Sequence, residues 1–322
     1  MALDGPVVCL AGGVGGSRLA HGLAQVLAPG QLTVIVNTAD DFRHYGLRVC
    51  PDLDTVMYNL AGLADPQRGW GLRDDSVHML RALQRLGEEG WFQLGDQDLA
   101  TQVLRSHWLA QDLRLTEVTA RLTAALGVGQ TLLPMCDEPV ATMVQTRGGG
   151  ELDFQTWFVR ERWQPPVRSL RLAGIGRARM TGEVSDALAR ATLVLLAPSN
   201  PWLSILPILA VPGLRAVLRQ ASAPVVAVTP VIRGAALKGP AARLMADFGL
   251  APAAATVCAL YGDILDAFVY DERDAVPPPA GLRLLGADTV MDNEDARARL
   301  AREILDWTAT WRPPAVPERE ES

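Results

Sequence analysis

The chain has 322 residues, 49% hydrophobic and 20% charged, which is the composition of a globular protein with an ample core. Its net charge of −6 provides no basic surface, so the composition argues against binding to nucleic acid or to an acidic membrane. The cysteines lie far apart and form no C-x-x-C pair. No basic N-terminal region precedes an apolar segment, and prolines interrupt the most apolar stretch, 193–218. We therefore expect a reduced, cytoplasmic protein without a membrane span.

The chain opens with a predicted strand, a glycine-rich turn and a helix. Residues 7–11 are an apolar run typical of a buried parallel strand, and apolar residues recur at helical spacing from Leu19 to Leu27. Such a turn brings backbone N–H groups close to a phosphate at the positive end of a helix. The turn has more glycines than a simple turn needs, which favours a nucleotide or diphosphate site. It matches neither the dinucleotide-binding fingerprint nor a P-loop. The alternative to a phosphate site is a tight strand–helix turn without a ligand. The ligand-binding candidates are Gly12, Gly13, Gly15, Gly16 and the expected N-cap Ser17.

Four carboxylates follow the second predicted strand, 32–37. Asp40 and Asp41 stand just beyond its carboxyl end, where open α/β sheets bind ligands. Asp52 and Asp54 open a helix, which either of them could simply cap. Four carboxylates are more than capping needs, and oxygen ligands suit Mg²⁺ near phosphates. We therefore predict a metal or ribose site in this group.

The middle of the chain is predicted to differ from the α/β pattern. Residues 61–127 are expected to be mainly helical, and Asp98 lies near the start of one helix, as a cap or as a ligand-binding residue. Residues 140–159 have the pattern of a β-hairpin. Its second strand would carry Phe154, Trp157 and Phe158, either as core or as a platform for a flat ring.

The α/β alternation then resumes. A strand at 193–197 is followed by Ser199 and Asn200, whose side chains offer hydrogen bonds near a helix start. Further strands are expected at 224–229 and 267–270, and helices at 241–248 and 293–307. We predict a nucleotide-binding core over 1–60 and 165–312, a helical and hairpin insertion over 61–164, and a disordered tail over 313–322.

In their order along the chain, these stretches resemble the 2-phospho-L-lactate transferase family of deazaflavin coenzyme biosynthesis. No single segment is decisive, but the ordered set is very specific. The matching segments are Gly-Gly-Val-Gly-Gly-Ser (12–17), Asn-Thr-Ala-Asp-Asp (37–41), Cys-Pro-Asp-Leu-Asp-Thr (50–55), Leu-Gly-Asp-Gln-Asp-Leu-Ala-Thr (94–101), Leu-Pro-Met-Cys-Asp-Glu-Pro-Val (133–140), Phe-Gln-Thr-Trp-Phe-Val-Arg (154–160), Pro-Ser-Asn-Pro (198–201) and Ser-Ile-Leu-Pro-Ile-Leu-Ala-Val-Pro-Gly (204–213).

The resemblance implies a Rossmann-like three-layer α/β core with a mainly parallel sheet, usually in a homodimer. It implies transfer of a phosphorylated three-carbon acid from its guanosine diphosphate-activated form to a hydroxyl of the deazaflavin Fo, with Mg²⁺ and release of GMP. Asp40 and Asp54 are then the expected catalytic carboxylates, and with Asp41 they are the expected metal ligands. Gly12 to Ser17, Asp41, Asp98, Ser199 and Asn200 would bind the substrates.

Some positions depart from the family pattern. Gln102 replaces a common histidine, Cys136 a common serine, and Ala141 an arginine that often precedes the threonine. These departures bear on the donor acid, for which we favour phosphoenolpyruvate over 2-phospho-L-lactate because the chain most resembles bacterial members. The rival hypothesis is a nucleotide-sugar-binding regulator of the gluconeogenesis-factor type, in which Gly-Gly-Ser-Ser-Gly typically follows the Asp-Asp pair. Here Phe-Arg-His-Tyr-Gly (42–46) follows instead.

Overall fold

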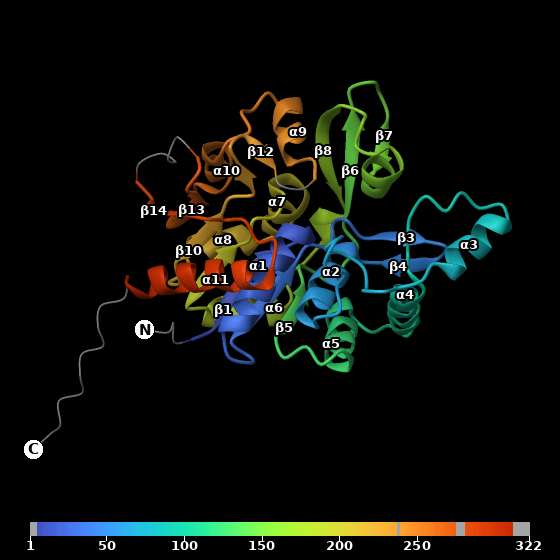
Figure 1. The fold of residues 1–322 in the computed structure, drawn as a ribbon, viewed down its shortest axis with the longest axis horizontal. Coiled ribbons are helices and arrows are strands. Elements are labelled where there is room, and N and C mark those ends of the chain that lie inside the picture. The colour runs from blue at the N-terminus through green and yellow to red at the C-terminus, as the bar shows by residue number, and fades with distance from the viewer. Residues whose placement is uncertain (1–4, 237–238, 275–280, 312–322) are drawn as a thin grey trace, which may run out of the picture.

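A seven-stranded parallel sheet forms the centre of the protein (Figure 1). The computed structural model describes residues 5–236, 239–274 and 281–311, so the predicted tail 313–322 lies outside the described residues. Within them the strand order is β14-β13-β10-β9-β1-β2-β5, with every pair parallel. The strands are β1 (Val7–Ala11), β2 (Leu32–Val36), β5 (Thr131–Pro134), β9 (Leu193–Leu196), β10 (Val225–Val228), β13 (Ala267–Asp271) and β14 (Arg283–Ala287).

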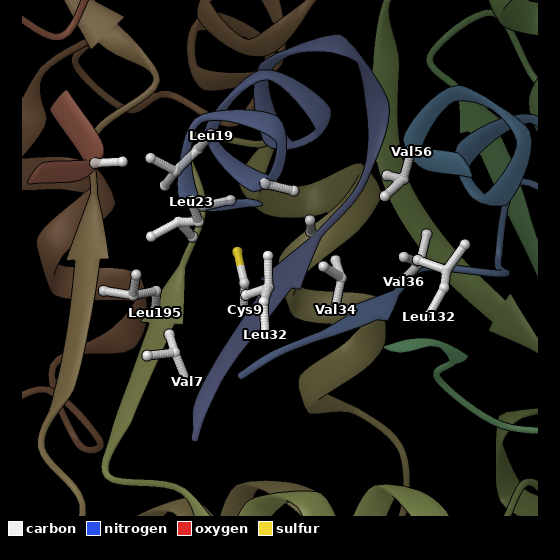
Figure 2. Close-up of a cluster of buried hydrophobic side chains, with 14 of the residues drawn as sticks. Val7, Cys9, Leu19, Leu23, Leu32, Val34, Val36, Val56, Leu132 and Leu195 are labelled. Atoms are coloured by element: carbon white, nitrogen blue, oxygen red, sulfur yellow. The ribbon is translucent and has the colours of Figure 1, made fainter. Parts of the chain in front are cut away.

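Helices cover both faces of this sheet. Because successive side chains of a strand point to opposite faces, Cys9 of β1 packs under one helical layer and Leu10 under the other. Figure 2 shows Leu19 and Leu23 of the first layer above Cys9. The layers are α1 (Gly13–Val26), α2 (Pro51–Leu60), α5 (Leu115–Ala125) and α11 (Glu294–Ala309) on one face, and α6 (Gly182–Arg190), α7 (Leu206–Leu209), α8 (Leu214–Arg219) and α10 (Ala254–Tyr261) on the other. The predicted three-layer Rossmann-like core is thus confirmed.

Smaller elements surround the carboxyl edge of the sheet. In Figure 1 the β3–β4 hairpin, α3 and α4 extend to the right, and the β6–β8 sheet stands at the top. No helix among the described residues is both long and apolar enough to cross a bilayer. These elements are β3 (Phe42–His44), β4 (Leu47–Val49), α3 (His78–Arg85), α4 (Asp96–Leu109), β6 (Ala141–Thr146), β7 (Glu151–Asp153), β8 (Val167–Ala173), β11 (Val231–Ile232), β12 (Ala235–Ala236) and α9 (Ala241–Asp247), with short helical turns at Thr156–Arg160, Ile175–Arg177 and Pro201–Ile205.

Three features of the middle segment differ from the sequence prediction. The second strand of the hairpin ends at Asp153, so Phe154, Trp157 and Phe158 lie on or next to a helical turn instead of a strand. The partner of β6 on its other side is β8, which was not predicted. Finally, β5 falls inside the predicted insertion 61–164 but forms the edge of the central sheet by pairing with β2.

The contact between α1 and α11 allows a test of the packing. A Cβ on Gly22 of α1 would lie 2.2 Å from the backbone oxygen of Arg297, so α11 can approach only because residue 22 has no side chain. We expect Gly22→Ala to lower the free energy of unfolding by about 1–3 kcal/mol, the usual cost of overpacking. Urea unfolding measures this. The control Gly182→Ala adds a Cβ with no atom within 4 Å, and an equal effect of both changes would contradict the prediction.

Candidate active site

The main cavity of the described residues lies where the strand order reverses. From β1 the chain continues into α1 on one face of the sheet, and from β9 it continues into α7 on the other. Diverging connections of this kind leave a crevice at the carboxyl ends of parallel strands. A cavity of about 670 Å³ occupies it, bordered by most of the predicted site residues: Gly12, Gly13, Gly15, Asp40, Asp54, Asp98, Ser199 and Asn200.

Each glycine of the turn has a steric reason that involves no ligand. Gly13 has a φ of +60°, which favours glycine. A Cβ would lie 2.4 Å from Asp52 Oδ2 at Gly12, 2.3 Å from the Pro198 backbone oxygen at Gly15, and 2.3 Å from Ser199 Oγ at Gly16. The abundance of glycine is therefore explained by packing and is not by itself a sign of phosphate binding.

The prediction of Ser17 as the N-cap of the first helix was wrong. The helix α1 begins at Gly13 with Gly12 as its N-cap, and Ser17 lies buried inside the helix, where its hydroxyl donates to the Val14 backbone oxygen at 2.9 Å. The first-turn N–H groups of an α-helix lack intrahelical acceptors. Gly13 donates to Asp52 Oδ1 at 2.8 Å, and Val14 and Gly15 border the cavity.

Ser199 and Asn200 connect the β9 loop to its surroundings. The Ser199 hydroxyl donates to the Gly12 oxygen at 2.8 Å and accepts from the Gly12 N–H at 3.1 Å, so it fixes the glycine turn. Asn200 Oδ1 accepts from the N–H groups of Trp202 and Leu203 and caps the turn that follows. Its amide Nδ2 is buried and has no partner among the residues that the structure describes, so it is available to donate to a ligand.

Asp52 joins the glycine turn to β2. Its Oδ1 accepts from Gly13, and its Oδ2 accepts from Asn37 Nδ2 at 2.9 Å. Asn37 Nδ2 also donates to the Leu203 oxygen at 3.0 Å, which ties the turn after β9 into the same network. Burial raises the pKa of Asp52 to about 6. Asp52 thus has the capping role that the sequence left open, although it caps α1 and not its own helix.

Asp40 and Asp41 differ in their partners. Asp41 Oδ2 pairs with Arg48 Nη2 at 2.9 Å, and burial raises the pKa of Asp41 while Arg48 opposes the rise. Asp40 is 6% exposed and borders the cavity, and its Oδ1 has no hydrogen-bond partner in the described part of the chain. Burial and the negative charges of Asp52 and Asp41 raise the pKa of Asp40 well above its usual range. Asp40 is therefore a buried carboxylate without a cation in the described residues.

A network of polar side chains connects α2 to α4. Arg105 binds both carboxylate oxygens of Asp54, and Gln102 Nε2 donates to Asp54 Oδ2 and to Asp98 Oδ1, both at 2.9 Å. The Tyr58 hydroxyl donates to Asp98 Oδ1 at 2.7 Å. Burial and the charge of Asp54 raise the pKa of Asp98 to about 6. Neither Tyr58 nor Arg105 was predicted, although Asp98, Gln102 and Arg105 repeat at helical spacing as a polar stripe on the buried face of α4.

Aromatic side chains form the other end of the cavity. Trp157 is fully buried, its Nε1 donates to the Pro165 oxygen at 2.9 Å, and it does not border the cavity. The hypothesis that Trp157 stacks on a ring ligand is therefore wrong. The tryptophans at the cavity are Trp70, which is 40% exposed, and Trp91, which packs edge-on against Phe92.

The predicted metal ligands are not gathered into one centre. Among the described residues no group of three or more His, Cys, Asp or Glu side chains is arranged to hold a metal ion. Asp41 and Asp54 are paired with Arg48 and Arg105, and of the three candidates only Asp40 has no arginine partner within the described chain.

The fold and this cavity define a Rossmann-like protein with a cavity at the switch point of its parallel sheet. The family model described as 2-phospho-L-lactate transferase CofD matches residues 7–294. The chain therefore belongs to this family, as its sequence motifs predicted.

Relatives with assigned names agree with this assignment, and a solved structure shares the fold. The chain is 36% identical over 303 residues to a 2-phospho-L-lactate transferase of Methanosarcina mazei, covering 93% of this chain and 99% of that protein. It is 38% identical over 309 residues to a phosphoenolpyruvate transferase of Streptomyces griseus, covering 93% and 97%. A crystal structure of a UPF0052 family member from Bacillus halodurans shares the fold, with a TM-score of 0.62 at 16% identity over 95% of this chain and 100% of that chain.

Proposed function

We propose that the protein transfers a phosphorylated three-carbon acid from its guanosine diphosphate-activated form to a hydroxyl of the deazaflavin Fo, releasing GMP. The observation that carries the proposal is one cavity with two chemically different ends. One end consists of the glycine turn and the loops after β9, β10 and β14. The other end consists of aromatic side chains near α2 and α4.

The loop end suits the donor. The first-turn N–H groups of Val14 and Gly15 border it and provide donors at the positive end of α1. The unpartnered amide of Asn200 supplies another donor. An attack on a diphosphate requires positioning and charge neutralisation more than a covalent nucleophile, so these groups match the needs of the reaction.

The aromatic end suits a flat acceptor. Trp70, Trp91, Phe92 and Phe158 border the cavity there, and such rings stack on planar heterocycles. Asp54 and Asp98 lie in the wall near them, so a polar chain attached to the ring meets carboxylates. Asp54 has about four lone-pair positions. Arg105 and Gln102 occupy three, which leaves one to accept from the attacking hydroxyl and orient it.

The carboxylates present fit one Mg²⁺ at Asp40. This buried carboxylate has an unpartnered oxygen beside Asp52 and lacks a cation in the described residues, which is an environment that a divalent ion would stabilise. Asp41 would share its oxygens between such an ion and Arg48, whereas Arg105 and Gln102 leave Asp54 only the position assigned to the acceptor hydroxyl. A bound Mg²⁺ would neutralise charge that develops on the diphosphate. We also infer a cytoplasmic homodimer, on the family resemblance.

Mass spectrometry of Fo tests the proposal. Protein, Fo and Mg²⁺ are incubated with guanosine diphosphate-activated phosphoenolpyruvate, 2-phospho-L-lactate or phosphoglycerate. We expect a phosphodiester of Fo with release of GMP, and the phosphoenolpyruvate form as the best donor. The relatives named 2-phospho-L-lactate transferase are 36–38% identical to this chain and those named phosphoenolpyruvate transferase 38–39%, so identity does not choose the acid. Binding of Fo or GDP without transfer from any donor would instead support the regulator hypothesis.

A further inference from the structure

Two arginines near the cavity have no acidic partner. Arg18 lies on α1 just after the glycine turn and borders the cavity. Arg297 lies on α11 and is 8% exposed. The Nε atoms of both are buried without a hydrogen-bond partner, and neither forms an ion pair within the described ranges. Within the described residues, the hydrogen-bond contact of the Arg297 guanidinium is with the imidazole of His21, at 3.4 Å between Nη1 and Nδ1, and not with a carboxylate.

The two positive charges also act on each other. Burial lowers the pKa of Arg18, and burial together with the charge of Arg18 lowers the pKa of Arg297. Asp292 attracts Arg18 and Glu294 attracts Arg297, but neither carboxylate is within ion-pair distance. Buried polar donors are normally paired, so two neighbouring arginines whose buried Nε atoms have no partner among the described residues indicate a place for an anion.

The position of Arg18 indicates the kind of anion. It borders the same cavity as Val14 and Gly15, whose N–H groups point from the first turn of α1, and as Thr289 from the loop after β14. Backbone donors at a helix start together with a guanidinium fork match phosphate oxygens. A single carboxylate would not need both sets of donors.

We propose that Arg18, with Arg297 as a second positive charge behind it, forms a subsite for the diphosphate group of the donor. The subsite rests on the proposed function for the identity of the nucleotide, but its chemistry requires only a diphosphate. Free pyrophosphate and a nucleoside diphosphate are the two sources of that chemistry, and the test separates them.

Calorimetry with pyrophosphate, GDP and GMP tests the subsite. For Arg18→Gln we expect the affinity for pyrophosphate and for GDP to fall about 10-fold or more, the value of one charge-assisted bidentate contact, and the affinity for GMP to fall less. The matched control is Arg302→Gln, an exposed position on α11, for which we expect no change. Arg18→Lys keeps the positive charge but lacks the two-pronged guanidinium, so its affinity for pyrophosphate and GDP should lie between those of the wild type and Arg18→Gln. Circular dichroism confirms that each variant is folded.

The outcomes separate this inference from the proposed function. Equal affinities of the wild type and Arg18→Gln for pyrophosphate and GDP would overturn the subsite, as would a wild type that binds neither. If Arg18→Gln loses pyrophosphate and the wild type transfers no acid to Fo, the subsite stands and the transferase proposal fails. A loss confined to GDP would place Arg18 at the nucleoside and not at the diphosphate, and would also contradict the inference.

Discussion

Replacing Arg105 by Met should lower the free energy of unfolding by about 3–5 kcal/mol, the usual cost of leaving a buried charge without its partner. Arg105 is 1% exposed and binds both oxygens of Asp54, which is itself 5% exposed. Its removal would also release the Gln102 side-chain oxygen, which accepts from Arg105. Urea unfolding monitored by tryptophan fluorescence measures the loss.

A double-mutant cycle identifies the cause of this loss. If the unpaired carboxylate causes it, Arg105→Met should cost much less in an Asp54→Asn background. The control Arg302→Met changes an exposed arginine on α11 and should shift stability by less than about 0.5 kcal/mol. An equal cost of Arg105→Met with and without the carboxylate of Asp54 would show that lost packing, and not the ion pair, explains the effect.

The core of the fold could be predicted because its signals are local. The strands β1, β9 and β10 are fully buried, continuous apolar runs, and β2 departs from this pattern only at Thr33. A parallel sheet buried on both faces requires such runs. The strand β8 has exposed residues along its length, and the sheet-edge strand β14 includes exposed ones, so neither has a strong apolar pattern. Pairing with β6 and β13 stabilises them, and a single sequence does not specify that pairing.

The sequence could predict which carboxylates belong to the site, but not which of them pair with arginines. Asp40, Asp54 and Asp98 all border the cavity, as expected from their positions after strands or at helix starts. Which carboxylates are neutralised depends on Arg48 of the β3–β4 hairpin and Arg105 of α4. Their packing against the sheet involves long-range contacts. The sequence therefore predicted Asp40 and Asp54, together with Asp41, as metal ligands, where the structure distinguishes Asp40 from the other two.

This distinction leads to the second large effect, which is expected for Asp40→Asn. If Asp40 binds Mg²⁺ at the diphosphate, the change should lower turnover about 100-fold or more, as removal of one charge-stabilising group does in other enzymes. The same change should not destabilise the protein in the absence of metal. Asn is uncharged, and it replaces a buried carboxylate that has an unpartnered oxygen and lies near Asp52. A loss of activity with unchanged or increased stability would separate a functional group from a structural one.

The difference in stability between the wild type and Asp40→Asn should depend on pH. Burial raises the pKa of Asp40 above the ordinary value of 3.8, so above about pH 4 the carboxyl stays protonated in the folded protein while it ionises in the unfolded chain, which favours unfolding as the pH rises towards the raised pKa. Without Mg²⁺, the stability of the wild type should therefore fall relative to Asp40→Asn as the pH increases above about 4, and the two should converge at lower pH.

Mg²⁺ binds the ionised form, so it should raise the melting temperature of the wild type at neutral pH and leave that of Asp40→Asn unchanged. Asp306→Asn, at an exposed position on α11, is the matched control and should respond to Mg²⁺ like the wild type. An equal response of Asp40→Asn to Mg²⁺ would remove Asp40 from the metal site.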